Sequence, residues 1–240
     1  INENGLCNYC SDYLDSRLNK QSLRQHSSED LEDLIKNIKR KGRNKKYDCI
    51  VGVSGGVDSS WVLVKVKELG LRPLAVHMDK GWNSELAQNN ISNLISNLDV
   101  DLYTHVIDWN EYRNLMQSFF DSDVVDVELL YDNAMLATNY NLAKKFGVKY
   151  ILGGTNVATE GMKMPSNWNW FKYDKKNIKN IAKRFGNHKL VTFPSIGIWE
   201  YLHCEYFLRI KWVSFLDYLE YNKNEAINSL SANFKYKPYP

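Results

Sequence analysis

Residues 48–60 read DCIVGVSGGVDSS, an apolar run followed by two glycines, an aspartate and several serines. The run 48–53 is typical of a short buried strand, and Gly55 and Gly56 predict a tight turn directly after it. A helix is predicted next, at about 59–69. Because glycine lacks a Cβ, backbone N–H groups in such a turn can approach an anion, and the start of a helix adds unpaired N–H groups. The stretch therefore predicts a strand, a phosphate-binding turn and a helix.

Strand-like and helix-like patterns alternate along the chain beyond this stretch. Further strands are predicted at 73–78, 102–107 and 148–152, with helices at about 84–98, 110–120 and 128–146. Short apolar strands separated by helices predict an α/β fold with a doubly wound parallel sheet, covered on both faces. Since ligands bind beyond the carboxyl ends of the strands in such sheets, the residues after each strand are the candidates for function.

The two ends of the chain differ from this alternation. Residues 1–28 are polar and irregular, and a helix with Ser27 or Ser28 as its N-cap follows them. Near the other end, helices are predicted at about 199–221 and 224–233. We expect an N-terminal segment, a sheet domain and a C-terminal helical segment, at 1–46, 47–198 and 199–240. Because the chain does not begin with Met and stops straight after a helix, we expect a piece of a longer protein.

The composition narrows the class of protein. With 240 residues, 44% of them hydrophobic, and 7 Trp, 15 Tyr and 9 Phe, the chain has the apolar content of a folded domain. It contains no apolar run of the about 18–20 residues that a membrane helix needs, so we expect a cytoplasmic protein and no membrane partner. A net charge of +3 is too small to indicate nucleic-acid binding.

Hydroxyl and carboxylate side chains give the turn at 54–60 its chemistry. Ser54, Ser59 and Ser60 offer hydroxyl donors, and Asp58 is a candidate ligand for Mg²⁺ held against phosphates. The stretch is neither a Walker A loop nor a dinucleotide fingerprint, since it has no Gly-Lys-Ser/Thr and no G-x-G-x-x-G. A plain strand-to-helix turn would explain the glycines but leaves the aspartate between serines unexplained.

The segment Ser54-Gly55-Gly56-Val57-Asp58-Ser59 resembles the PP-loop of the ATP pyrophosphatase superfamily. Those enzymes bind the pyrophosphate of ATP and transfer AMP to a substrate oxygen, after which nitrogen or sulfur attacks the adenylated carbon. The resemblance implies ATP and Mg²⁺ as cofactors, with catalytic residues Asp58, Ser59 and Asp79. It implies ATP-binding residues Val53, Ser54, Gly55, Gly56, Val57, Asp58, Ser59, Ser60, Val76, His77, Met78, Gly153, Gly154 and Thr155.

For two groups among these residues a packing explanation stays open. Val76, His77 and Met78 would contact adenine through the backbone, yet His77 and Met78 are equally typical of a strand end packed under a helix. Close approach to the nucleotide would explain Gly153 and Gly154, and a simple turn explains them nearly as well.

Several short stretches resemble one branch, the N-acetyl sugar amidotransferases of bacterial surface-polysaccharide and flagellar-sugar biosynthesis. They are 3–10, 77–84, 153–156, 159–161, Trp168, Phe193-Pro194 and 235–240. The resemblance implies that ATP adenylates the carbonyl oxygen of an acetamido group on a nucleotide-activated sugar, and that ammonia displaces AMP to leave an acetamidino group. It implies a separate glutaminase subunit as the ammonia source, and substrate-binding residues Trp82, Glu160, Lys163 and Trp168.

A cysteine pair and two groups of charged residues also have candidate functions. Members of the branch resemble this chain at Cys7 and Cys10 and carry a second C-x-x-C upstream, which implies half of a zinc site here. Asp126 and Asp132 are candidates for assisting Mg²⁺ or handling ammonia, or else surface carboxylates. The six basic residues in 39–46 fit a phosphate-binding arm or, more simply, a solvated helix end.

Two other functions compete with the amidotransferase hypothesis. A tRNA-thiolating PP-loop enzyme generally needs a pair of reactive cysteines or a cysteine-bound cluster, and Cys204 is the one cysteine after the loop. A non-catalytic adenine-nucleotide-binding module would not need Ser54, Asp58 and Ser59 together.

Overall fold

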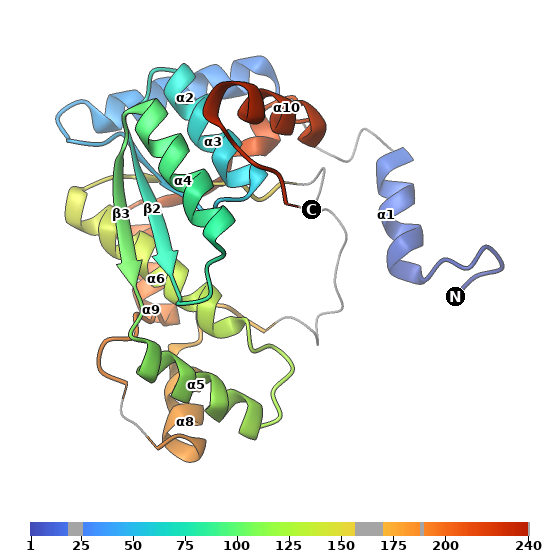
Figure 1. Cartoon of the computed structure of the whole chain (residues 1–240), viewed down its shortest axis with the longest axis vertical. Helices are drawn as coiled ribbons and strands as arrows, with labels where there is room; N and C mark the ends of the chain where they lie inside the picture. Colours follow the sequence, from blue (N-terminus) through green and yellow to red (C-terminus); the bar gives the residue numbers. More distant parts are fainter. Residues whose placement is uncertain (19–25, 157–169, 188–189, 240) are drawn as a thin grey trace.

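A five-stranded sheet, parallel throughout, forms the centre of the computed structural model, which describes residues 1–18, 26–156, 170–187 and 190–239 (Figure 1). Its strands are β1 (Cys49–Gly52), β2 (Pro73–Asp79), β3 (Asp101–Val106), β4 (Tyr150–Gly153) and β5 (Lys211–Ser214). They lie in the order β3-β2-β1-β4-β5, and every neighbouring pair is parallel. This arrangement confirms the predicted α/β fold.

Helices cover both faces of the sheet. They are α1 (Asn8–Leu18), α2 (Ser28–Gly42), α3 (Val57–Glu68), α4 (Glu85–Leu98), α5 (Trp109–Asp121), α6 (Leu129–Phe146), α8 (Lys175–Phe185), α9 (Ile198–Leu202) and α10 (Lys223–Phe234), with a π-helix at His203–Phe207 and a 3-10 helix at Phe215–Tyr218. Consecutive residues of β1 point to opposite faces: Val51 packs in a core with residues of α2, α3, α4 and α10, and Ile50 in a core with residues of α6. The sheet is therefore doubly wound.

A third apolar cluster lies beyond the sheet. Leu115 and Phe119 of α5 pack with Ile178 of α8 and with Leu130 at the start of α6. In Figure 1, α5 and α8 lie side by side past the end toward which the β2 and β3 arrows point. This cluster borders the carboxyl edge of the sheet, where ligands bind in α/β folds.

The helix predicted over 199–221 is wrong. That stretch forms α9, the π-helix, strand β5 and the 3-10 helix. Arg209 adopts a left-handed φ of 53°, which ends the helical part, and β5 then pairs with β4. Closely spaced aromatic side chains imitate helical periodicity here, whereas a four-residue edge strand leaves little alternation to detect.

The expectation of an irregular N-terminus is wrong as well, since α1 occupies part of 1–28. The helix predicted after it is confirmed as α2, with Ser27 as N-cap in a capping box with Asp30. Within the described part of the chain, no helix is long and apolar enough to cross a bilayer. The division at 46 and 198 stays a prediction.

Candidate phosphate-binding site

The predicted phosphate-binding turn connects β1 to α3 at the carboxyl edge of the sheet. Gly55 has φ of 80°, and a Cβ there would lie 2.7 Å from the carbonyl oxygen of Ala87, so both conformation and packing require glycine. Gly56 is the N-cap of α3. Because glycine has no side chain, it offers no side-chain acceptor to the first N–H groups of the helix. An uncapped helix start at a glycine turn is a favourable site for an anion.

The serines of the turn differ in accessibility. Ser59 Oγ accepts from the backbone N–H of Ser54 at 3.1 Å and lies 3.1 Å from Ser54 Oγ. These bonds hold the turn, and both residues line the cavity described below. Ser60, by contrast, is buried, as is Val53 at the strand end. Ser60 does not line the cavity, so contact between its hydroxyl and ATP stays a prediction.

Asp58 lies in the first turn of α3 and accepts a hydrogen bond through Oδ1 from the hydroxyl of Tyr221. Burial and the Asp58 carboxylate raise the pKa of Tyr221, so the phenol keeps its proton and acts as the donor. The bond leaves Oδ2 of Asp58 for another partner. Mg²⁺ prefers oxygen ligands and is often bound by a carboxylate together with phosphate oxygens, so Asp58 Oδ2 is a suitable ligand.

A cavity of about 580 Å³ opens over this turn. It is lined by Ser54, Gly56, Val57, Asp58, Ser59, Gly154, Lys223, Ile227, Pro238 and Tyr239. Sequence reasoning placed six of these residues at an ATP site and missed the last four, which belong to α10 and the segment after it. The quoted resemblance at 235–240 was the available signal, but it carried no role for those residues.

Gly153 and Gly154 are explained by contacts inside the protein. A Cβ on Gly153 would lie 2.9 Å from Nε1 of Trp212, and one on Gly154 would lie 3.0 Å from the backbone nitrogen of Ser59. Thr155 Oγ1 lies 2.9 Å from Ser214 Oγ of β5. The glycines therefore let β4 pack against β5 and the start of α3, and a direct nucleotide contact stays a prediction.

Val76, His77 and Met78 lie buried on β2. The carbonyl oxygen of Val76 accepts from the N–H of Val53 at 2.8 Å, and Met78 is paired with His105 of β3. Asp79 ends the strand, and its Oδ1 accepts from Gly81 N at 2.8 Å. These residues thus lie at the predicted edge of the sheet, while the adenine contacts of Val76, His77 and Met78 and the catalytic role of Asp79 stay predictions.

Aromatic side chains gather just past Asp79. Trp82 is 61% exposed and Trp109 is 38% exposed, and their rings meet edge to face with centroids 4.9 Å apart. The ammonium of Lys80 lies 4.2 Å from the ring centroid of Tyr131. The other predicted substrate residues, Glu160, Lys163 and Trp168, lie outside the described residues.

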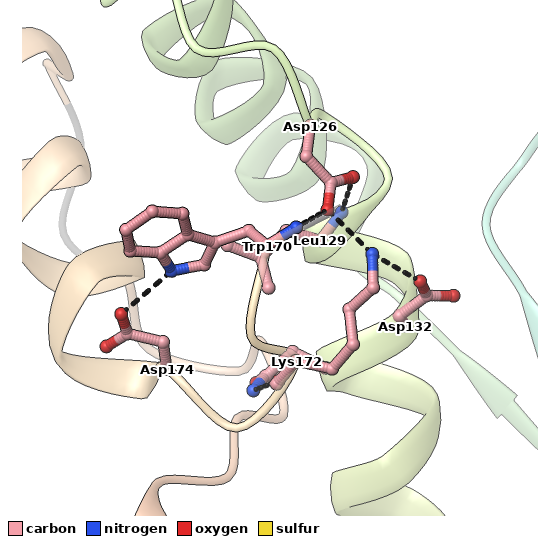
Figure 2. Close-up of polar contacts among 7 residues, drawn as sticks. Asp126, Leu129, Asp132, Trp170, Lys172 and Asp174 are labelled. Atoms are coloured by element: carbon pink, nitrogen blue, oxygen red, sulfur yellow. Dashed lines mark hydrogen bonds and ion pairs between the residues drawn. The ribbon is translucent and has the colours of Figure 1, made fainter. Parts of the chain in front are cut away.

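Asp126 and Asp132 converge on a single lysine (Figure 2). Lys172 Nζ lies 2.7 Å from Asp126 Oδ2 and 2.9 Å from Asp132 Oδ2. Asp126 also accepts from the N–H groups of Trp170 at 2.8 Å and Leu129 at 3.1 Å. The idea that the two carboxylates assist Mg²⁺ or handle ammonia is not supported, because they fasten residues 170–172 to the start of α6.

Cys7 and Cys10 do not form a zinc site with the described residues. Their sulfur atoms lie 3.4 Å apart, but the described part of the chain holds no group of three or more His, Cys, Asp or Glu side chains that could bind a metal ion. A structural zinc needs four ligands, so the expectation of zinc is not supported. The basic run 39–46 is also remote from the turn: Lys46 pairs with Asp101 at 2.9 Å, at the amino end of β3.

A parallel sheet whose first strand runs into a Ser-Gly-Gly-Val-Asp-Ser turn, an uncapped helix start and a cavity is the arrangement expected of a PP-loop ATP pyrophosphatase. In comparison with known families, NAD synthase matches residues 27–163, more than half of the chain. The chain belongs to the NAD synthase family.

The individual proteins that this chain resembles share at most 29% of its residues in the aligned regions. An uncharacterized protein of Methanocaldococcus jannaschii is 29% identical over 126 residues, which span 52% of this chain and 43% of that protein. Among solved structures, NMN synthetase from Francisella tularensis is 16% identical with a TM-score of 0.43, covering 90% of this chain and 99% of its own. NH3-dependent NAD synthetase from Campylobacter jejuni is 14% identical with a TM-score of 0.43, covering 88% and 86%.

Proposed function

We propose that this protein uses ATP to activate a substrate carbonyl oxygen and replaces that oxygen with ammonia-derived nitrogen, releasing AMP and pyrophosphate. The observation that carries the proposal is the uncapped start of α3, which borders the cavity together with Ser54, Asp58 and Ser59. Unpaired N–H groups and hydroxyls bind phosphate oxygens, and Asp58 Oδ2 would hold Mg²⁺ against them. Membership of the NAD synthase family supports an ATP-using reaction of this type.

The chemistry follows from the difference between two leaving groups. The carbonyl oxygen attacks the α-phosphorus of ATP. The bond between that phosphorus and the oxygen bridging the α- and β-phosphates breaks, and pyrophosphate departs with the bridging oxygen. Ammonia then adds to the activated carbon, its nitrogen releases a proton to solvent, and AMP leaves with the former carbonyl oxygen and the electron pair of the broken carbon–oxygen bond. An amide oxygen is a poor leaving group and AMP a good one, so adenylation lowers the barrier to substitution. In the protein, the turn and its magnesium would stabilise the negative charge that develops on pyrophosphate.

For the substrate we propose the acetamido group of a nucleotide-activated sugar, with ammonia supplied by a separate glutaminase subunit. The support is the resemblance of several stretches, including 77–84, to N-acetyl sugar amidotransferases. The exposed rings of Trp82 and Trp109 beyond the carboxyl end of β2 are consistent with it, since a sugar ring packs well on an indole face.

Sulfur transfer to tRNA is the alternative reaction of the same superfamily. It is disfavoured by the burial and the raised pKa of the two cysteine thiols that lie in 47–240. Cys49 and Cys204 are both buried, and burial raises the pKa of each thiol. A buried thiol with a raised pKa is a weak nucleophile.

The test is product analysis with two kinds of acceptor. The protein is incubated with ATP, Mg²⁺ and ammonium, together with either an N-acetylated nucleotide sugar or the carboxylate form of NAD. We expect AMP and pyrophosphate, and a sugar product in which NH replaces oxygen by mass spectrometry. Turnover of the NAD precursor alone would contradict the sugar assignment, and ADP with phosphate would contradict adenylation. Nucleotide binding without turnover of either acceptor would favour a binding module.

A further inference from the structure

The segment after α10 is fastened beside the phosphate-binding turn by two asparagines of α4. Asn90 is 1% exposed, and its Nδ2 donates to the carbonyl oxygen of Lys237 at 2.9 Å while its Oδ1 accepts from the N–H of Lys237 at 2.9 Å. The same Nδ2 lies 3.4 Å from the carbonyl oxygen of Gly55. Asn93 donates to the carbonyl oxygen of Lys235 at 3.3 Å. One buried amide thus connects the turn to the C-terminal segment.

The side of the cavity formed by α10 and the segment after it carries one cation. Of the described residues that line the cavity, Asp58 and Lys223 are the charged ones. Lys223 is the first residue of α10 and is exposed, and its ammonium makes no ion pair or hydrogen bond with a described residue. The start of α10 is already capped, because Asn222 Oδ1 accepts from the N–H groups of Asn224 and Glu225. The contribution of α10 to the cavity is therefore the ammonium of Lys223, not free N–H groups.

A buried phenol nearby also lacks a partner. Tyr236 is buried, and its hydroxyl makes no hydrogen bond with any described residue. Burial, with smaller effects of Tyr239 and the Asp58 carboxylate, raises the pKa of Tyr236 to about 12, so the phenol keeps its proton. Buried polar groups are nearly always paired, so this hydroxyl is an exception among the described residues, and it lies in the apolar core and not in the lining of the cavity.

We propose that Lys223 binds the pyrophosphate part of ATP from the α10 side of the cavity, and that Asn90 holds the C-terminal segment in place on the same side. The inference rests on the proposed use of ATP. Pyrophosphate carries more negative charge than one Mg²⁺ neutralises, and Asp58 adds a further negative charge to the same cavity. The loop itself supplies N–H groups and hydroxyls but no cation, so the lysine that α10 adds to the lining provides the missing positive charge.

The experiment measures binding of Mg²⁺-pyrophosphate, Mg²⁺-ATP and AMP by calorimetry to the full chain and three variants. The variants are Lys223→Gln, Lys223→Arg and, as a matched control, Lys176→Gln, an exposed lysine in the first turn of α8. We expect Lys223→Gln to weaken pyrophosphate binding about tenfold or more, because a charge-assisted contact is lost. Lys223→Arg should keep most of the affinity, and AMP binding should be unchanged.

The outcomes separate the two proposals. If the wild-type chain binds Mg²⁺-ATP and Lys223→Gln binds pyrophosphate equally well, the role of Lys223 is overturned and the proposed function stands. If Lys223→Gln weakens AMP as much as pyrophosphate, the residue acts on the fold of the site, which also overturns its role. If the wild-type chain binds neither nucleotide nor pyrophosphate, the proposed function fails together with this inference.

Discussion

The imidazole of His77, on β2, contacts the residue that follows β1 and precedes the turn at 54–60, with Nδ1 2.9 Å from the carbonyl oxygen of Val53. Because a carbonyl only accepts, Nδ1 carries the proton and Nε2 is the acceptor. Nε2 lies 3.0 Å from Nδ2 of Asn83, which also donates to Asp79 Oδ1 at 3.0 Å. The ring therefore positions the residue before the turn and the residues after β2, and both of its nitrogens are engaged.

Replacing His77 should destabilise the protein according to whether the donor at Nδ1 is kept. In His77→Leu the buried carbonyl of Val53 loses its partner, and we expect the free energy of unfolding to fall by about 1–3 kcal/mol. His77→Asn retains an N–H donor near the position of Nδ1 and should lose less. Urea unfolding of the three proteins measures this. Equal losses in the two variants would show that the ring acts through its volume, not through the bond to Val53.

Tyr221→Phe should change the response to magnesium while the fold is retained. The variant removes the donor that holds Asp58 Oδ1, so the carboxylate can turn away from the metal position. Partners of metal-binding carboxylates typically matter by about tenfold or more in metal affinity or activity. AMP release measured over a series of Mg²⁺ concentrations should therefore show a higher requirement. Tyr206→Phe, at an exposed tyrosine of the π-helix, is the control and should behave as wild type.

Asp58→Asn should abolish AMP release and leave the unfolding transition close to that of the wild-type protein. The amide keeps an oxygen that can accept from Tyr221, but it no longer offers a charged ligand to Mg²⁺. Circular dichroism verifies the fold of the variant used in the assay. Turnover at the wild-type rate would remove Asp58 from the metal role.

The contribution of Asp126 to stability should depend on pH. Burial alone would raise the pKa of Asp126, whose side chain is 12% exposed, but hydrogen bonds from Lys172, Trp170 and Leu129 outweigh burial and lower that pKa. A carboxyl with a lowered pKa in the folded state stabilises above its unfolded value, and that contribution is lost as the pH falls through the folded value.

Asp126→Asn should therefore lower the free energy of unfolding by about 2 kcal/mol at pH 7, where a charge-assisted pair is lost. The difference from wild type should shrink below about pH 4, as the wild-type carboxyl takes up its proton. Asp33→Asn on the exposed face of α2 is the control. Denaturant unfolding at several pH values measures both, and a difference that does not vary with pH would contradict the lowered pKa.

Gly154→Ala should disturb the phosphate-binding turn through packing. The added Cβ would lie 3.0 Å from Ser59 N and 3.1 Å from the carbonyl carbon of Asp58, so the start of α3 must shift. We expect a loss of about 1–3 kcal/mol in stability and weaker binding of Mg²⁺-ATP. Gly52→Ala is the matched control, because nothing lies within 4 Å of a Cβ there. Binding by Gly154→Ala equal to that of Gly52→Ala would contradict this account.

The turn at 54–60 and most of the fold around it follow from local patterns in the sequence. The four predicted strands are present as β1 to β4, and the helices between them begin and end within a few residues of their expected bounds. These features are set by nearby residues: apolar periodicity forms each element, and Gly55 supplies the positive φ of the turn. The same local logic failed at β5, since a four-residue edge strand depends on β4 for its hydrogen bonds.

The residues that surround the turn come from distant parts of the chain and are brought there by tertiary packing. Tyr221 bonds to Asp58 across 163 positions of the chain, and Asn90 bonds to Lys237 across 147. No periodicity or spacing in the sequence connects residues so far apart, because their meeting depends on how α4 and α10 pack on one face of the sheet. Lys172 likewise takes Asp126 and Asp132 as partners only once residues 170–172 reach α6. The turn is formed by neighbouring residues, whereas α10 and the segment after it reach the cavity only through packing against distant elements.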